Sequence, residues 1–156
     1  FFFQAEDGIR DYKVTGVRRV LFRSGVGAYA DTGAQKIAAL AVLYDSFVHI
    51  VARADAKVDK VGGLKGKRVS VGSAGSSTEA IADRILAAAG LNPLKDVTRD
   101  NLSVAESAAA LKDGKIDAFF WIGGLPTSAV TDLVTTGNTK VVFLPAGSLL
   151  PALNKK

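Results

Sequence analysis

The sequence contains no cysteine, one histidine and one tryptophan in 156 residues. The absence of cysteine excludes disulfides, cysteine nucleophiles and thiolate metal sites within this chain. Because His49 is the one histidine, a metal site built from several histidines is excluded as well. No apolar run approaches the roughly 20 residues that a membrane-spanning helix needs. The chemistry of this chain therefore depends on other residue types.

The composition is that of a globular chain. Hydrophobic residues make up 48% and charged residues 22% of the sequence, which is enough apolar side chain for a core and excludes disorder by composition. The length allows one ordinary domain or one lobe of a larger protein. The formal net charge is +5, but the basic residues are scattered and no stripe of aromatic and basic residues is present. We therefore expect no nucleic-acid partner and interpret the charge as a contribution to solubility.

The first 24 residues show neither helix nor strand periodicity and resemble the translation of a sequencing-library adapter. The resemblance rests on FFFQAEDGIRD at residues 1–11 and LFRS at residues 21–24. The alternative is an unusual basic extension. We interpret residues 1–24 as an artefactual extension and leave them out of the fold prediction. On this interpretation the natural amino terminus lies outside the sequence, so the lack of a signal peptide carries no information.

Residues 64–90 combine a strand, a glycine-rich loop and a helix, and the rest of the chain is organised around them. Residues 68–71 predict a short strand, residues 72–75 a loop of small residues, and residues 76–89 a helix. This order leaves several backbone amides pointing at one spot. Such a spot has positive potential and suits a carboxylate or a phosphate.

Both ends of the helix predicted at residues 76–89 carry end signals. Ser76 and Glu79 have the S-x-x-E spacing of a capping box, in which each side chain accepts the backbone N–H of the other residue. Gly90 supplies a left-handed stop. The residues expected to face inward share one side of the helix: Ile81, Ile85 and Ala88.

The remaining segments alternate between strand and helix patterns. Ser103 and Glu106 form a second capping box that opens a helix ending at Gly114, and Pro126 is placed in the first turn of a third helix that ends at Gly137. Further strands are predicted at residues 47–52, 97–102, 116–122 and 141–144. The expected inward-facing residues are Val104, Ala108 and Leu111 in the second helix, and Val130, Leu133 and Val134 in the third. The alternation predicts an α/β fold with a parallel sheet and helices on both faces.

Ligands of such sheets bind at the carboxyl ends of the strands, where two glycine-rich loops are expected, at residues 72–78 and 123–127. The hydroxyl groups of the first loop can donate hydrogen bonds to an anion, or they can merely cap the helix and form turns. From the local sequence both interpretations stay open. The residues concerned are Ser73, Ser76, Ser77 and Thr78.

The first loop does not match three well-defined motifs. It lacks the G-x-x-x-x-G-K-[ST] pattern of a Walker loop and the G-x-G-x-x-G pattern of a dinucleotide site. It also lacks the G-x-S-x-G spacing of a nucleophile elbow. His49 lies within an apolar strand, where a structural role is commoner than a role as a catalytic base. Trp121 shares one face of its strand with Phe119, opposite Phe120, and either lines a pocket or packs in the core.

Two longer stretches resemble a known family. They are FVHIVARADAKVDKVGGLKGKRVSVGSAGSSTEAIADRILAAAGL at residues 47–91 and ALKDGKIDAFFWIGGLPTSAVTDL at residues 110–133. They are similar to the TAXI-type solute receptors of tripartite ATP-independent periplasmic (TRAP) transporters. The most telling pieces are LKGKRVSVG-x-x-GS-x-TE and DGKIDAFFW-x-x-G-x-P, and the similarity runs from Tyr29 to Leu144.

The resemblance implies a type II periplasmic-binding-protein fold and a set of ligand-binding residues. The family pattern often has proline where this chain has Ala74, which loosens the loop but keeps its amides. The loop expected to hold a solute carboxylate carries Ser73, Gly75, Ser76, Ser77 and Thr78. The opposing loop carries Trp121, Gly124, Leu125 and Pro126, and the first lobe contributes Tyr29 and Tyr44.

Family members are longer than this chain, so we expect one nearly complete lobe and a fragment of the other. Residues 25–52 would be a fragment of the first lobe with a hinge strand, and residues 53–144 the second lobe. Residues 145–156 would begin the truncated return to the first lobe.

The implied function is that of the extracytoplasmic solute-binding subunit of a TRAP-type transporter. It would capture a small carboxylate or amino acid such as glutamate for the TRAP membrane permease subunits, without catalysis and without a cofactor. A periplasmic or extracytoplasmic location follows, with the signal peptide lost by truncation. Two other functions stay open: an α/β enzyme that uses phosphate or a nucleotide, and the effector-binding domain of a regulator.

Overall fold

The computed structural model of the chain describes residues 46–135 and 139–153. The chain divides into two units, of which the one described below comprises Val48–Ile122 and Pro126–Lys156. The strands are β1 (Phe47–Arg53), β2 (Arg68–Ser70), β3 (Thr98–Asp100), β4 (Ala118–Gly123) and β5 (Val141–Phe143). The α-helices are α2 (Ser77–Ala88), α3 (Val104–Lys112), α4 (Ser128–Thr135) and α5 (Leu150–Leu153). Short 3-10 turns are η2 (Ala54–Ala56), η3 (Val61–Leu64) and η4 (Gly147–Leu149).

The predicted strands and helices of the described part are confirmed, with one shifted start. Pro126 was expected in the first turn of the third helix, but α4 begins at Ser128. The backbone carbonyl of Thr127 accepts the first helical hydrogen bonds, from Val130 and Thr131. Pro126 therefore lies in the connection before the helix. Residues 1–24 and the predicted stop at Gly137 lie outside the described residues.

The sheet has the strand order β3-β2-β4-β1-β5 and is mixed, where a parallel sheet was expected. Strand β2 pairs in parallel with both β3 and β4, but β5 pairs antiparallel with β1, with Val51 opposite Phe143. The prediction was wrong for this pair because apolar strand residues indicate burial and not strand direction. The parallel part, β3-β2-β4, brings the carboxyl ends of three strands to one edge.

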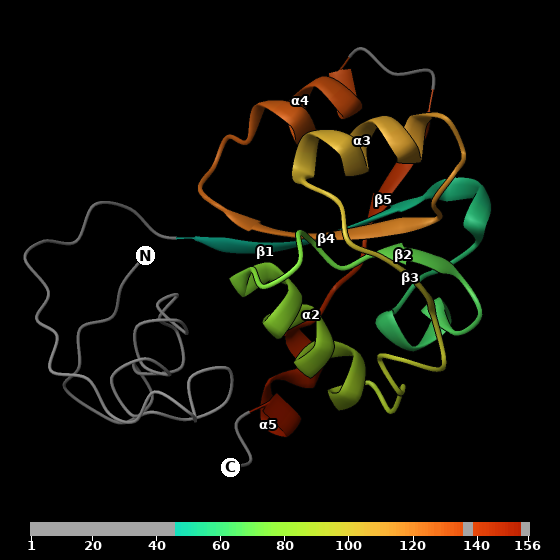
Figure 1. Ribbon diagram of the computed structural model, residues 1–156, viewed down its shortest axis with the longest axis vertical. Helices are drawn as coiled ribbons and strands as arrows, with labels where there is room; N and C mark the ends of the chain where they lie inside the picture. The colour runs from blue at the N-terminus through green and yellow to red at the C-terminus, as the bar shows by residue number, and fades with distance from the viewer. Residues whose placement is uncertain (1–45, 136–138, 154–156) are drawn as a thin grey trace, which may run out of the picture. The chain divides into compact units, whose positions relative to one another are not determined.

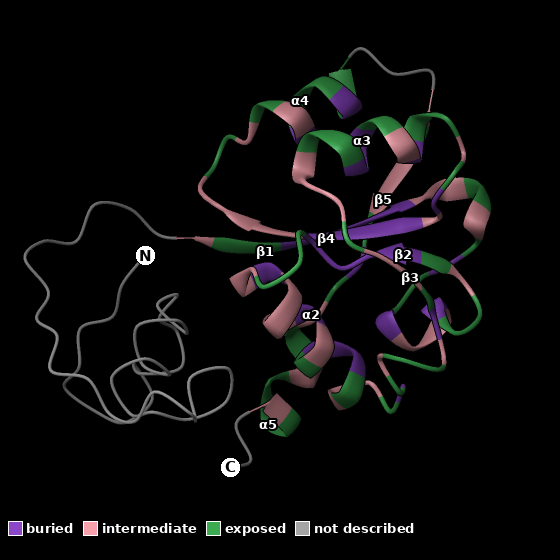
Figure 2. Cartoon of the chain, in the orientation of Figure 1, coloured by how far each residue is buried: buried purple, intermediate pink, exposed green. Residues whose placement is uncertain are grey.

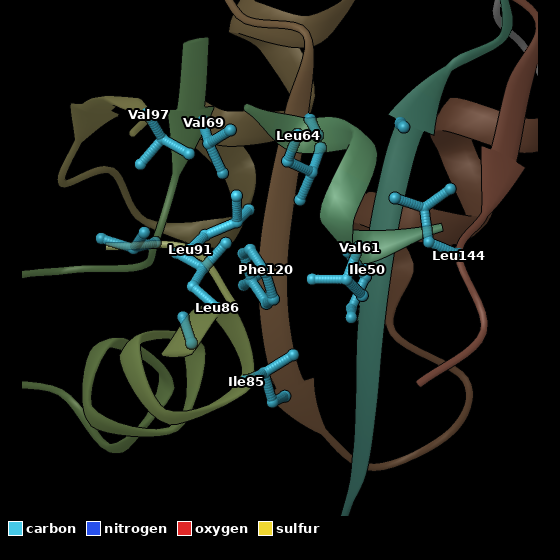
Figure 3. Close-up of a cluster of buried hydrophobic side chains, with 14 of the residues drawn as sticks. Ile50, Val61, Leu64, Val69, Ile85, Leu86, Leu91, Val97, Phe120 and Leu144 are labelled. Carbon is cyan, nitrogen blue, oxygen red and sulfur yellow. The ribbon is translucent and has the colours of Figure 1, made fainter. Parts of the chain in front are cut away.

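Helices cover both faces of the sheet, as expected (Figure 1). Helices α3 and α4 lie on one face, and α2 and α5 lie on the other. Figure 2 shows the buried residues concentrated in the strands and on the inner sides of the helices. The alternation predicted for β4 is confirmed, because Phe119 and Trp121 pack on the α3–α4 side and Phe120 packs on the α2 side. Figure 3 shows Phe120 among side chains that include Ile85 and Leu86 of α2.

Two predicted inward faces are rotated relative to the sequence pattern. The buried residues of α2 are Thr78, Ala82, Ile85 and Leu86, so Ile85 is confirmed, but Ile81 and Ala88 are only half-buried. In α4, Val134 is 53% exposed, while Val130 and Leu133 are buried as expected. Successive helical residues point about 100° apart. A residue that is adjacent in the sequence to a fully buried one, such as Ile81 beside Ala82 or Val134 beside Leu133, therefore lies at the edge of the buried face.

Local end signals were predicted more accurately. Gly90 has a φ of +81°, and the Leu91 N–H donates to the Leu86 carbonyl at 3.0 Å, which is the hydrogen bond of a Schellman motif. At the start of α3 the capping box between Ser103 and Glu106 is present in both directions. Both signals depend on residues a few positions apart, so the sequence alone can predict them.

A buried polar contact joins β2 to α3. Ser70 and Ser107 are 0% and 1% exposed, and their hydroxyl oxygens lie 2.8 Å apart. Each hydroxyl satisfies the other inside an otherwise apolar interface, which avoids the cost of a buried unpaired polar group. The contact holds the end of β2, where the glycine-rich loop begins, against α3.

We expect Ser107→Ala to lower the free energy of unfolding by about 1–3 kcal/mol, because the Ser70 hydroxyl is left buried without its partner. The double variant Ser70→Ala/Ser107→Ala should cost less than the sum of the two single variants. Urea unfolding followed by circular dichroism measures all three. A fully additive double variant would contradict the proposed pairing.

His49 on β1 is 9% exposed, and its Nε2 atom has no hydrogen-bond partner among the residues described. Its ring packs edge-on against Phe143 of β5, with ring centroids 6.4 Å apart. Burial lowers the pKa of His49 below its ordinary value of 6.5, because an imidazolium here would lose its hydration. His49 therefore binds a proton less readily in the folded sheet than in the unfolded chain.

The free energy of unfolding should fall as the pH drops from about 7 to 5.5, because the unfolded chain binds a proton at His49 that the folded chain does not. Asp117 and Glu79 have a pKa that is lowered on folding, so both stabilise the fold at neutral pH. Their contribution is lost only as the pH falls below the ordinary pKa values of 3.8 and 4.5, which lie outside that range. Urea unfolding across this pH range tests the expectation. The same pH dependence in His49→Phe would contradict it.

Candidate functional site

The glycine-rich loop between β2 and α2 turns sharply at Gly72. This residue is buried and has a φ of +95°, which residues other than glycine rarely adopt. A Cβ atom on Gly72 would lie 2.7 Å from both Cβ and Cγ2 of Thr78. The backbone of the loop thus passes directly against the first turn of α2, and only glycine fits there.

Gly72→Ala should lower the free energy of unfolding by about 2–4 kcal/mol, because it combines backbone strain with a steric clash. Gly75→Ala is a matched control. Gly75 has a φ of +71°, but nothing lies within 4 Å of an added Cβ, so its cost should stay near 1 kcal/mol. Urea unfolding of both variants makes the comparison. Equal costs would contradict the close approach of Gly72 to Thr78.

Ser76 caps α2, as the sequence predicted. Its Oγ atom accepts the backbone N–H of Glu79 at 3.2 Å. The reciprocal half of the predicted capping box is absent. The Ser76 N–H donates to the Ser73 carbonyl, and the Glu79 carboxylate accepts the N–H of Gly75 at 2.6 Å. A local turn already uses the Ser76 amide, so the carboxylate reaches one residue further back.

This arrangement decides which of the predicted donors remain open to a ligand. The Gly75 amide is occupied by the Glu79 carboxylate. The amides of Ser77 and Thr78, the first two of α2, have no acceptor among the residues that the structure describes. Ser73 is exposed and Ser77 is half-buried, whereas Thr78 is buried against Gly72. The helix dipole adds positive potential at these amides.

A network of charged and polar side chains, which the sequence pattern did not indicate, holds the loop from the side of β3. The Asn101 Nδ2 atom donates to the Gly72 carbonyl and to Glu79 Oε1, both at 2.9 Å. Arg99 donates to Glu79 Oε1 at 2.5 Å and to Asp83 Oδ1 at 2.5 Å. Burial would raise the pKa of Glu79, but the hydrogen bonds from Arg99, Gly75 and Asn101 outweigh it and lower that pKa.

The second predicted segment follows the carboxyl end of β4, the parallel neighbour of β2. Trp121 is half-buried against the core cluster on the α3–α4 side, and its Nε1–H donates to Thr127 Oγ1 at 3.1 Å. The indole therefore packs against this cluster with part of its surface exposed. Gly124 is half-buried, Leu125 is 62% exposed, and Pro126 is exposed. A role of these four residues in ligand binding stays a prediction.

The two tyrosines expected to contribute from the first lobe are Tyr29 and Tyr44. Both lie outside the described residues, so their contribution to ligand binding stays a prediction. Within residues 46–135 and 139–153, no group of three or more histidine, cysteine, aspartate or glutamate side chains is placed to hold a metal ion. In the same ranges no helix has the length and apolar character needed to cross a membrane.

Comparison with known proteins connects this fold to periplasmic binding proteins. The model of the NMT1-like family matches residues 20–156. The structure is similar to the periplasmic aliphatic sulphonate binding protein SsuA from Escherichia coli, with 27% sequence identity and a TM-score of 0.54. That similarity covers 69% of this chain and 33% of SsuA.

A second solved structure supports the same fold. It is a putative periplasmic sulfonate-binding protein SsuA from Methylobacillus flagellatus KT, with 22% identity and a TM-score of 0.53, and the similarity covers 65% of this chain and 28% of that one. The chain thus spans about a third of the length of these proteins. The predicted periplasmic-binding-protein fold is confirmed.

Proposed function

The chain belongs to the NMT1-like family, and from this membership and the fold we propose that it is part of an extracytoplasmic solute-binding protein that captures a small organic anion for a membrane permease. The observation that supports this function most directly is the amino-terminal end of α2. There the amides of Ser77 and Thr78 have no acceptor among the described residues and follow the carboxyl end of a parallel strand. Amides in this position bind anionic groups in many α/β proteins.

Two lines of support concern the solute. The resemblance to TAXI-type receptors favours a carboxylate such as glutamate, and the likeness to the E. coli aliphatic sulphonate binding protein favours a sulfonate. Both groups present several oxygens to the same donors. The proposal is therefore a small organic acid whose anionic group lies at the Ser77 and Thr78 amides.

The partners and location follow from the same proposal. Capture for transport needs a membrane permease and a location outside the cytoplasm. The TAXI resemblance favours a permease of the TRAP class. Trp121, Pro126 and the tyrosines Tyr29 and Tyr44 would complete the ligand contacts. No step of this function is chemical, so neither a cofactor nor a catalytic residue is required.

Isothermal titration of the 156-residue chain tests the proposed function. The ligands are glutamate, methanesulfonate and ATP, which separate a carboxylate, a sulfonate and a nucleotide. We expect a saturable response to at least one of the two small acids and none to ATP. ATP binding with turnover, and no response to either acid, would contradict solute capture and support an enzyme.

The Ser77 amide can be tested by itself, because it belongs to the first residue of α2, where proline is well tolerated. Ser76 has extended backbone angles, φ −81° and ψ 160°, which also suit a following proline. Ser77→Pro removes the N–H donor and should weaken binding of the preferred acid about tenfold or more. Ser77→Ala keeps the amide and loses only the hydroxyl, so its loss should be about twofold. Equal affinities of the two variants would show that the amide does not bind the anion.

A further inference from the structure

The conformation of the Gly72–Gly75 backbone depends on side chains outside the loop, one in the first turn of α2 and one just after β3. Two of its polar groups are held by side chains: the Gly72 carbonyl by Asn101 and the Gly75 N–H by Glu79. Asn101 also donates to Glu79 Oε1. The loop is therefore tied at both of its glycines, although glycine itself allows many backbone conformations.

Glu79 can hold the loop only if its own side chain is fixed. Its carboxylate accepts from Gly75 through Oε2 and from Arg99 and Asn101 through Oε1. Arg99 is in turn fixed by Asp83, one helical turn further along α2. The Arg99 side chain is 17% exposed, so water screens these contacts less than it screens a surface ion pair. A planar guanidinium is suited to join two carboxylates in this way.

The same contacts have an electrostatic consequence for a bound anion. Glu79 lies in the first turn of α2, close to the Ser77 and Thr78 amides in the chain. An unpaired carboxylate there would repel an incoming anion and could turn to other amides. Contact with Arg99, whose positive charge is shared with Asp83, offsets part of this charge and fixes the direction of the carboxylate.

We propose that Arg99 and Asn101 are positioning residues of the anion site: through Glu79, and for Asn101 also through the Gly72 carbonyl, they hold the Gly72–Gly75 loop in the conformation in which the Ser77 and Thr78 amides have no acceptor among the described residues. Neither residue needs to touch the ligand for this role. The inference rests on the proposed function for its effect on binding, whereas its effect on the loop is independent of any ligand.

The test uses the full 156-residue chain with two variants and a control. Arg99→Gln removes the contacts to Glu79 and Asp83, and Asn101→Ala removes the contacts of the exposed Asn101 side chain to Gly72 and Glu79. The control is Arg68→Gln. Arg68 also pairs with one carboxylate, Asp117, at 2.6 Å, but it lies at the opposite end of β2 from the loop.

Amide hydrogen exchange followed by NMR measures the loop without a ligand. The Gly75 amide reports on the loop, and the Leu91 amide, bonded to the Leu86 carbonyl at the other end of α2, reports on the helix. Arg99→Gln should speed exchange at Gly75 about tenfold relative to Leu91, and Asn101→Ala about threefold. Arg68→Gln should leave this ratio within about twofold of the starting protein. A ratio that is unchanged in Arg99→Gln overturns the proposal.

Titration with methanesulfonate and with glutamate then measures binding. Arg99→Gln should weaken binding about tenfold and Asn101→Ala about threefold, with no change in Arg68→Gln once the folded fraction is taken into account. Equal losses in Arg99→Gln and Arg68→Gln would overturn the positioning role, because they would reflect general destabilisation. If no protein binds either acid while Gly75 exchange still depends on Arg99, the proposed function is wrong and the positioning of the loop stands.

Discussion

The hydrogen bonding of the Glu79 carboxylate is the interaction on which the candidate site depends. Three donors from two segments meet on it: the Gly75 amide of the loop, and the side chains of Arg99 and Asn101 at the carboxyl end of β3. They join the loop, the first turn of α2 and the carboxyl end of β3. Charge-assisted hydrogen bonds are stronger than neutral ones, and a carboxylate in the first turn also interacts favourably with the helix dipole. The Glu79 side chain thereby fixes the conformation of the Gly72–Gly75 loop, whose glycines allow many backbone conformations.

The sheet provides the frame for this interaction. Because β2 lies between β3 and β4 and is parallel to both, three carboxyl ends share one edge. Apolar packing of Phe120 against α2 and of Phe119 against the opposite face keeps the sheet between its two helix layers. The buried Ser70–Ser107 contact then fixes the end of β2 where the loop starts. A small anion at this edge meets donors that are already oriented, so little ordering is required when it binds.

The sequence predicted what depends on local pattern and missed what depends on tertiary partners. The Ser76 cap, the Gly90 stop and the alternation of Phe119 and Phe120 follow from spacing alone, and all are confirmed. The direction of β5 was wrong because an apolar run carries no sign of strand direction. The Glu79–Gly75 hydrogen bond was missed because the capping box pairs Glu79 with the Ser76 N–H. In the structure the Ser76 N–H donates to the Ser73 carbonyl, and the Glu79 carboxylate accepts from Gly75 instead. Arg99 and Asn101 were missed because their contacts with Glu79 and Gly72 form only once β3 is placed beside β2.

The central claim is that an anion binds at the first amides of α2, with Gly75 reserved for Glu79. It is tested most directly by mapping backbone amide chemical shifts of the 156-residue chain as methanesulfonate or glutamate is added. The account predicts that the largest saturable changes occur at Ser77 and Thr78, while the Gly75 amide keeps its position. Changes centred on the amino ends of the strands, or a Gly75 amide that moves as far as those of α2, would contradict it.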